Sequence, residues 1–387
     1  MPVRILYISH LHPPEDALLE NMGGMQRVSI QLVNELKKRN DIELKTVILK
    51  APWKNIEFRA TGFLFRLIWK LPALVRKFDA DVVLFSSMVT ASVSLFIRNR
   101  IDVPLVTINH GQDVTLPVNL YQKMVPRIFE KLDGVISVSN ATRQACIERG
   151  MDPEKGVSLP NGFAQSDIGS YPDRLMSRNE LEKFFNINLD DRYLLLTVGR
   201  LVKRKGHSWF IKEVLPKVKK DVVYLVIGNG PELDRVQLLA NASDCKDRVI
   251  IAGRQPDDIL KKVYAAADLF MMPNIPVPGD MEGFGIVLLE ANLAGTPAIA
   301  SDLEGIRDVI ENGQNGYRIP AGHSDEFASV IDKVLGQNLN AFRDKARSYV
   351  VEHFSWEHVA DQYINYLKTV SAPDQSEKKQ KMTHIYR

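Results

Sequence analysis

The sequence predicts an α/β protein with two doubly wound domains, and three observations support this fold class. Apolar runs of strand length alternate with segments of helical period along most of the chain. The alternation occurs twice, and a polar break separates the two series. At 387 residues the chain is also long for a single hydrophobic core. Continuous apolar strands between amphipathic helices indicate parallel sheets that are covered on both faces.

The first series predicts a Rossmann-like domain over residues 1–165. Between its strands lie helical segments such as 25–39, which places Val28, Leu32 and Leu36 on one face. Its strand candidates are 4–9, 43–49, 80–86, 104–109 and 134–139.

The second series predicts a similar domain over residues 166–355. The break at 160–191 is rich in Pro, Gly, Ser and Asp, and we interpret it as a linker. A helix over 356–370, with Ser355 as its N-cap, is expected to pack back toward the first domain. The polar tail 371–387 is expected to be disordered. The strand candidates are 192–199, 221–228, 248–253, 268–273 and 297–301.

The composition is that of an ordinary globular protein, with 45% hydrophobic and 25% charged residues and a net charge of +3. The cysteines, Cys146 and Cys245, are isolated and suggest neither a disulfide nor a metal site. No signal peptide precedes the first strand, and no apolar run approaches the ~18 residues of a membrane span. These features predict a cytoplasmic protein, and no pattern indicates nucleic-acid binding.

In paired α/β domains, ligands bind in the cleft at the carboxyl ends of the strands. The first strand-to-helix loop is unusually long and ends in Gly23 and Gly24, whose amides can approach a phosphate or a sugar. His110 follows the strand 104–109 and precedes Gly111, so it can reach a ligand oxygen. The alternatives are a flexible loop with a tight turn for the glycines, and purely local hydrogen bonds for the histidine.

The second domain offers a basic loop directly after its first strand. Arg200 presents a forked donor set for phosphate oxygens and Lys205 a point charge, with a glycine on either side of the pair. The alternative is a solvated basic loop, and we assign Lys203 and Arg204 to such a solvated face. The segment Gly228-Asn229-Gly230 lacks a third glycine, so it does not match the dinucleotide fingerprint.

Two glutamates, Glu282 and Glu290, interrupt an apolar segment that is rich in glycine. A helix is expected from about residue 285 to residue 294, with Glu282 before it and Glu290 two turns inside. Both side chains can then accept hydroxyl groups of one extended ligand. The alternatives are stabilisation of the helix dipole by Glu282 and a salt bridge for Glu290. Unpaired donors at the start of this helix are the amides of Phe284, Gly285 and Ile286.

The order of these motifs resembles that of a GT-B retaining glycosyltransferase of family 4. The resemblance extends from the first loop to the last helix, and its most specific element is the E-x7-E pair with its glycine-rich context. The motifs are GG (23–24), HG (110–111), PNG (160–162), GRL-x3-KG (199–206), GNGP (228–231) and E-x7-E (282–290).

The resemblance implies two facing Rossmann-like domains with a ligand cleft between them, and a role for each motif. Glu290 would hold the ribose hydroxyls of a nucleotide diphosphate sugar. Glu282, with the amides that open the helix, would hold the transferred sugar. Arg200 and Lys205 would neutralise the diphosphate. From the first domain, Gly23 and Gly24 would contact the diphosphate and His110 would lie near the reacting centre.

The implied reaction transfers a hexosyl unit (mannose, glucose or N-acetylhexosamine type) from a UDP- or GDP-linked sugar with retention of configuration. A glycan or lipid-linked acceptor in cell-envelope polysaccharide or glycolipid synthesis is expected. No metal or other cofactor is expected. The alternatives are a nucleotide-sugar epimerase or hydrolase of the same architecture, and a catalytically inactive sugar-binding protein.

The segment 58–78 combines a large apolar complement with five basic residues and no acidic one. A basic amphipathic helix of this kind can lie on an anionic membrane surface, here the inner face. The alternative is a helix packed in the core with its cations extended to solvent. The basic residues are Arg59, Arg66, Lys70, Arg76 and Lys77.

Overall fold

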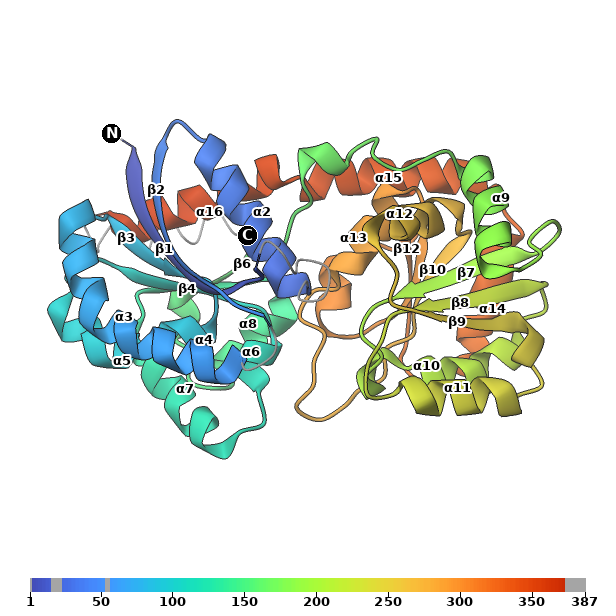
Figure 1. Cartoon of the computed structure of the whole chain (residues 1–387), viewed down its shortest axis with the longest axis horizontal. Coiled ribbons are helices and arrows are strands. Elements are labelled where there is room, and N and C mark those ends of the chain that lie inside the picture. Colours follow the sequence, from blue (N-terminus) through green and yellow to red (C-terminus); the bar gives the residue numbers. More distant parts are fainter. Residues whose placement is uncertain (1, 15–22, 53–55, 373–387) are drawn as a thin grey trace. The chain divides into compact units, whose positions relative to one another are not determined.

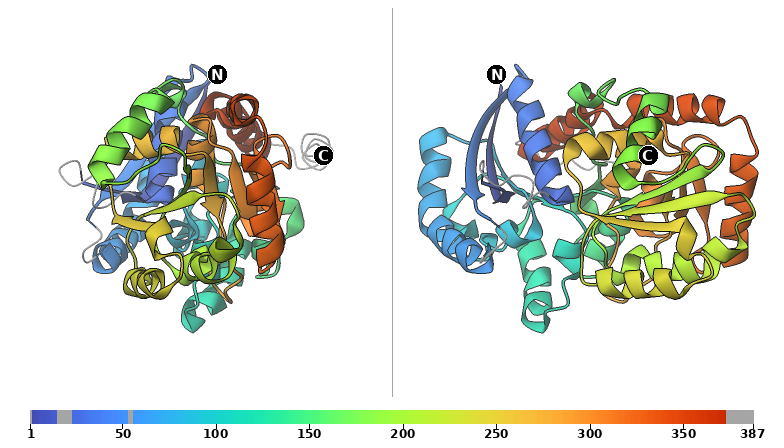
Figure 2. Two further views of the ribbon diagram at one scale, coloured as in Figure 1. Left: turned by 90° about the vertical axis from the view of Figure 1, so that its right-hand side faces the viewer. Right: turned by 45° about the vertical axis from the view of Figure 1, so that its right-hand side comes forward.

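A computed structural model describes residues 2–14, 23–52 and 56–372. The chain divides into two compact units. Unit 1 comprises Met1–Gly162 and Trp356–Arg387, and unit 2 comprises Phe163–Ser355. Each unit contains one six-stranded parallel sheet with helices on both faces (Figure 1, Figure 2). The prediction of two doubly wound α/β domains is therefore confirmed.

The sheet of unit 1 has the strand order β2-β1-β3-β4-β5-β6, and all its strands are parallel. The five strands expected from the sequence are present. The edge strand β6 was not predicted, because three residues are too few to show a pattern. The strands are β1 (Val3–His12), β2 (Ile42–Lys50), β3 (Val82–Phe85), β4 (Leu105–Asn109), β5 (Gly134–Ser137) and β6 (Gly156–Ser158).

Helices α2 and α16 cover one face of this sheet, and α3, α4, α5, α7 and α8 pack on the other around a buried apolar cluster. The closing helix α16 belongs to unit 1. Its Trp356 donates from Nε1 to Gln31 on α2 over 2.9 Å, and the Tyr366 hydroxyl donates to the carbonyl of Lys155 over 2.6 Å. The helices are α2 (Gly24–Lys38), α3 (Ile56–Phe78), α4 (Met88–Ala91), α5 (Ser94–Ile97), α6 (Gln112–Thr115), α7 (Asn119–Lys131), α8 (Asn140–Ile147) and α16 (Trp356–Ser371).

The sheet of unit 2 has the order β12-β11-β10-β7-β8-β9 and is also parallel. Again the five expected strands are present, and the short edge strand β12 was not predicted. The strands are β7 (Tyr193–Val198), β8 (Val222–Ile227), β9 (Val249–Gly253), β10 (Leu269–Met272), β11 (Ala298–Ser301) and β12 (Gly316–Ile319).

Helices α10, α11 and α14 pack on one face of this sheet, and α9, α12, α13 and α15 lie on the other. Within the described ranges, no helix is long and apolar enough to cross a bilayer. The helices are α9 (Arg174–Phe185), α10 (His207–Trp209), α11 (Leu233–Ala242), α12 (Asp257–Ala266), α13 (Ile286–Leu293), α14 (Ser324–Leu335) and α15 (Leu339–Phe354).

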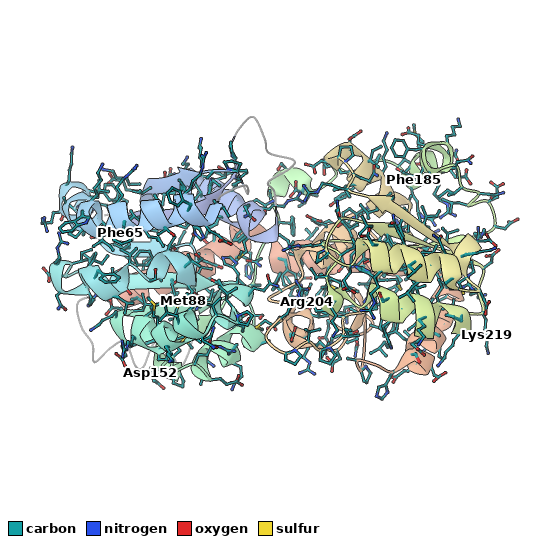
Figure 3. All side chains as sticks on the ribbon, turned by 60° about the horizontal axis from the view of Figure 1, so that its bottom comes forward. Phe65, Met88, Asp152, Phe185, Arg204 and Lys219 are labelled. Carbon is teal, nitrogen blue, oxygen red and sulfur yellow. The ribbon has the colours of Figure 1, made fainter. Side chains whose placement is uncertain are left out.

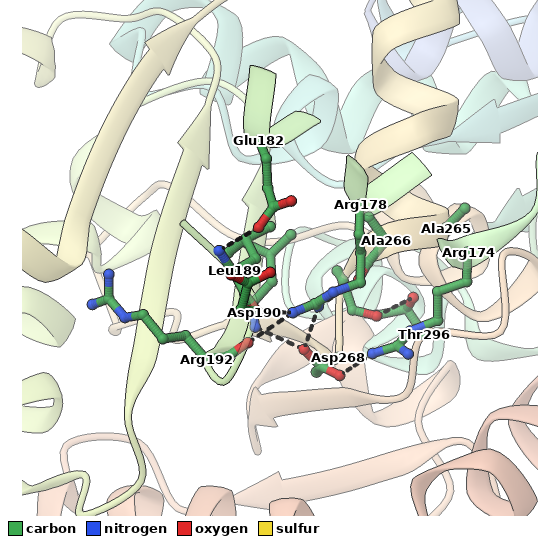
Figure 4. A network of polar contacts seen from close by, with 12 residues as sticks. Arg174, Arg178, Glu182, Leu189, Asp190, Arg192, Ala265, Ala266, Asp268 and Thr296 are labelled. Atoms are coloured by element: carbon green, nitrogen blue, oxygen red, sulfur yellow. Dashed lines mark hydrogen bonds and ion pairs between the residues drawn. The ribbon is translucent and has the colours of Figure 1, made fainter. Parts of the chain in front are cut away.

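The interpretation of residues 160–191 as a linker is wrong for Arg174–Phe185, which forms helix α9 and packs against α12. This helix is held to the sheet by charge rather than by an apolar stripe. Arg174 and Arg178 both pair with the buried carboxylate of Asp268 (Figure 4). This carboxylate also accepts from the amide of Leu194 over 2.7 Å. The polar sequence of α9 therefore gave no helical signal.

Candidate active site

The predicted site residues of unit 2 lie on loops that follow strands of its sheet. Two glycines allow these loops to pack tightly. A Cβ on Gly206, whose φ is 68°, would lie 1.9 Å from the carbonyl oxygen of Pro273. A Cβ on Gly228, whose φ is 145°, would lie 1.8 Å from the carbonyl oxygen of Gly199. The loops after β7, β8 and β10 are thus packed against one another at the carboxyl ends of their strands.

Glu282 lies in the loop after β10, and three donors converge on its Oε2 atom. Lys205 Nζ is 2.6 Å away, Asn274 Nδ2 is 3.2 Å away, and the guanidinium of Arg204 makes a short contact. Burial alone would raise the pKa of Glu282, but the charges of Lys205 and Arg204 outweigh it and lower that pKa to about 2. Glu282 is therefore a buried carboxylate that stays ionised at neutral pH.

The assignment of Arg204 to a solvated face is wrong. Its side chain, labelled in Figure 3, is 12% exposed. It bridges two carboxylates, because Nε donates to Asp280 over 2.9 Å while Nη1 donates to Glu282. Its backbone carbonyl accepts from the amide of Ile275 over 2.8 Å. Lys203 is exposed, as expected. Arg204 is thus a site residue that the sequence did not reveal.

Helix α13 begins one residue later than expected, at Ile286, with Gly285 as its N-cap in the left-handed region at φ 88°. No described residue accepts a hydrogen bond from the amides of Phe284, Gly285 or Ile286. Free amides at a helix N-terminus bind ligand oxygens, since the helix dipole adds to their positive charge. The structure therefore presents three such donors between the two glutamates.

Glu290 lies half-buried on α13, where its Oε2 accepts from the Tyr264 hydroxyl over 2.8 Å. Its hydrogen-bond partner on α12 is distinct from the partners of Glu282. Arg200 is exposed, and its guanidinium forms no ion pair with any described residue. Of the predicted residues in unit 2, the structure thus joins Lys205 directly to Glu282 and gives Glu290 and Arg200 separate surroundings.

His110 lies in unit 1 at the end of β4 and is 9% exposed. Its Nε2 donates to the carbonyl of Ser86 over 3.0 Å, which fixes the tautomer and leaves Nδ1 unprotonated in the neutral ring. Asp113 holds this turn, since its carboxylate accepts from the amides of His110 at 2.8 Å and Met88 at 3.0 Å. Burial and the neighbouring His110 lower the pKa of His10 to about 4. Asp113 and His10 were not among the site residues predicted from the sequence.

Gly23 caps α2 in an extended conformation and Gly24 is its first residue, whereas positions 15–22 of the predicted loop lie outside the described residues. Helix α2 is fixed to β1 by Ser29, which lies in its second turn. Its hydroxyl lies 2.7 Å from that of Tyr7 and 3.0 Å from His12 Nε2. The two glycines are therefore carried by a firmly anchored helix.

Comparisons with known proteins agree with these motifs. The family described as Glycosyltransferase Family 4 matches residues 22–165, and Glycosyl transferases group 1 matches residues 178–360. A phosphatidyl-myo-inositol mannosyltransferase of Mycobacterium leprae is 29% identical over 374 residues, which cover 90% of this chain and 94% of the relative. A GDP-mannose-dependent α-(1-6)-phosphatidylinositol monomannoside mannosyltransferase of Mycobacterium tuberculosis is 28% identical, over 67% of this chain and 68% of the relative.

Two solved structures have the same fold. Anabaena Alr3699/HepE in complex with UDP and glucose has a TM-score of 0.72 at 19% identity, over 95% of this chain and all of that chain. Sucrose-phosphate synthase from Thermosynechococcus elongatus has a TM-score of 0.75 at 18% identity, over 96% of this chain and all of that chain. The protein described above is therefore a glycosyltransferase of family 4, of the group 1 type, with the GT-B fold.

Proposed function

We propose that the protein is a retaining hexosyltransferase that uses a nucleotide diphosphate sugar and acts in cell-envelope polysaccharide or glycolipid synthesis. The observation that carries the proposal is the set of three amides at the start of α13 that have no acceptor among the described residues, flanked by Glu282 and Glu290. Similar proteins are named as mannosyltransferases, one of them GDP-mannose-dependent, and a similar structure contains UDP-glucose. GDP-mannose and UDP-glucose are therefore the first donors to test, with a glycan or lipid-linked acceptor.

The proposed roles follow from the chemistry of each group. Glu290 accepts the ribose hydroxyls, and Glu282 with the free amides binds the transferred sugar. Arg200 and Lys205 stabilise the negative charge that grows on the departing diphosphate, which is the main catalytic contribution. Because these cations provide positive charge, we propose that the donor binds without a metal ion. The roles of Gly23, Gly24 and His110 remain predictions from the family resemblance.

The donor role of Glu290 predicts a loss of ligand-dependent stability in Glu290→Ala. A ligand at 100 times its Kd stabilises the folded protein by about 2.7 kcal/mol, so the correct donor should raise the Tm of the wild type in a thermal-shift panel of UDP, GDP and their sugars. Glu290→Ala should lose most of that shift. Glu326→Ala, on the exposed surface of α14, should retain it. A full shift in Glu290→Ala would contradict the proposed role.

We further propose that unit 1 binds the anionic inner face of a membrane through α3. One face of this helix is packed in the core, with Leu67 and Leu71 buried. Phe65, which is labelled in Figure 3, is instead 64% exposed, and Trp69 is 73% exposed. Phe96, on α5 beside α3, is 60% exposed. The core-packing alternative for 58–78 thus holds for one face of the helix. The exposed aromatic rings between basic residues on its other face support the membrane proposal, since such a surface suits an anionic lipid interface.

Vesicle co-sedimentation tests this surface. Binding should increase with the fraction of phosphatidylserine and decrease with salt, because each basic residue near the surface contributes about 1 kcal/mol. The double variant Phe65→Ser and Trp69→Ser should lose most of the binding, whereas Leu238→Ser, an exposed apolar residue of unit 2, should not. Binding that ignores anionic lipid content would count against the proposal.

A further inference from the structure

Two cations in the loop after β7, Arg204 and Lys205, already pair with a carboxylate of the protein. Lys205 Nζ lies 2.6 Å from Glu282 Oε2, and Arg204 donates to the same oxygen. The three side chains are only 10–12% exposed. A buried cation without a counter-ion destabilises the folded protein, so Arg204 and Lys205 require an anion beside them whether or not a ligand is bound. A diphosphate that binds to Arg204 and Lys205 therefore has to compete with Glu282 for them.

We propose that Arg204 and Lys205 form a phosphate subsite which Glu282 occupies in the free protein and leaves when a diphosphate binds. The inference rests on the proposed function and adds Arg204 to the phosphate-binding residues. Carboxylate and phosphate oxygens suit the same guanidinium and ammonium donors, so one can replace the other. Arg204 Nε also donates to Asp280 over 2.9 Å, so the guanidinium stays in place after Glu282 has moved away.

The exchange makes Glu282 a specificity-determining residue. A nucleotide sugar offers hydroxyls to Glu282 once it has left the cations, whereas a nucleotide diphosphate offers none. No described residue donates to Glu282 Oε1, and the neighbouring Asn274 is 1% exposed with a buried Oδ1 that has no partner among the described residues. Glu282 should therefore raise the affinity for the nucleotide sugar relative to the affinity for the product diphosphate. When no sugar hydroxyls are present, its carboxylate competes with the diphosphate for Lys205 and Arg204.

Calorimetric titration with UDP, GDP and inorganic pyrophosphate tests the exchange. Glu282→Gln should bind the diphosphate probes about tenfold more tightly than the wild type, because the competing charge is gone. Glu326→Gln is the control, since it removes one negative charge from the exposed surface of unit 2 and leaves the pairing of Lys205, Arg204 and Glu282 intact. Its affinity should change by less than about threefold. Equal affinity gains in both variants, or none in Glu282→Gln, would overturn the exchange.

Two further measurements keep the outcome clear. Arg204→Met should weaken pyrophosphate binding about tenfold, and unchanged binding would remove Arg204 from the subsite. If Glu282→Gln is too unstable to titrate, pyrophosphate should raise its Tm more than that of the wild type, and an equal or smaller rise would overturn the exchange. A wild type that binds none of the three probes would instead disprove the proposed function. A wild type that binds them while Glu282→Gln binds no better would disprove the exchange alone.

Discussion

Lys205→Ala is expected to lower kcat for sugar transfer by about 100- to 1000-fold, which is the usual loss when a preorganised charge-stabilising donor is removed from an active site. The Lys205 ammonium is buried, and its only partner among the described residues is Glu282. In such surroundings a charge interacts more strongly with a leaving diphosphate than it would in water. Steady-state rates with the donor selected by the thermal-shift panel give the measurement.

Lys203→Ala is the matched control for this substitution. Lys203 and Lys205 belong to the same short 3-10 turn, Lys203–Lys205, but Lys203 is exposed. Its removal should leave kcat within about twofold, since screened surface charges contribute little. The fold of Lys205→Ala should persist, because Arg204 still pairs with Glu282. A kcat loss of similar size in both variants would show that Lys205 acts only through the general charge of the loop.

The sequence predicted the sheets well because buried parallel strands are continuous apolar runs. The prediction failed for elements whose stability comes from tertiary contacts rather than from a local apolar pattern. The edge strands β6 and β12 are three and four residues long and contain glycine, so their pairing depends on a neighbouring strand. Helix α9 buries only Ser177 and Leu181 and is fixed by arginines. Local patterns do not reveal contacts of this kind.

The limit of local sequence patterns also explains which site residues could be predicted and which could not. Lys205 and Glu282 could be chosen from their places in loops after strands, and the structure brings them within an ion-pair distance of 2.6 Å. Arg204 could not, because its partners Asp280 and Glu282 lie 76 and 78 positions further along the chain. Next to Lys203 in a basic run, it has the local appearance of a solvated residue. Only the tertiary structure shows that Arg204 is buried in ion pairs while Lys203 is exposed.

Asp268→Ala is expected to destabilise unit 2 by about 3–5 kcal/mol, the usual cost of removing one partner from a buried ion pair. The Asp268 side chain is 3% exposed and directly precedes β10. It pairs with Arg174 and Arg178 (Figure 4), and its Oδ2 accepts from the buried amide of Leu194. The substitution therefore leaves two cations and one backbone donor without their acceptor.

Urea unfolding monitored by circular dichroism measures this loss. Asp221→Ala is the control, since its partner Arg192 belongs to the same unit but the Asp221 side chain is 64% exposed. Such a pair contributes about 0–1 kcal/mol. Arg178 keeps the carbonyls of Leu189 and Arg192 as acceptors, so α9 should loosen rather than leave the sheet when Asp268 is lost. If Asp268→Ala unfolds at the same urea concentration as Asp221→Ala, ion pairing does not hold α9 in place. Its contact with α12 would then have to supply that stability.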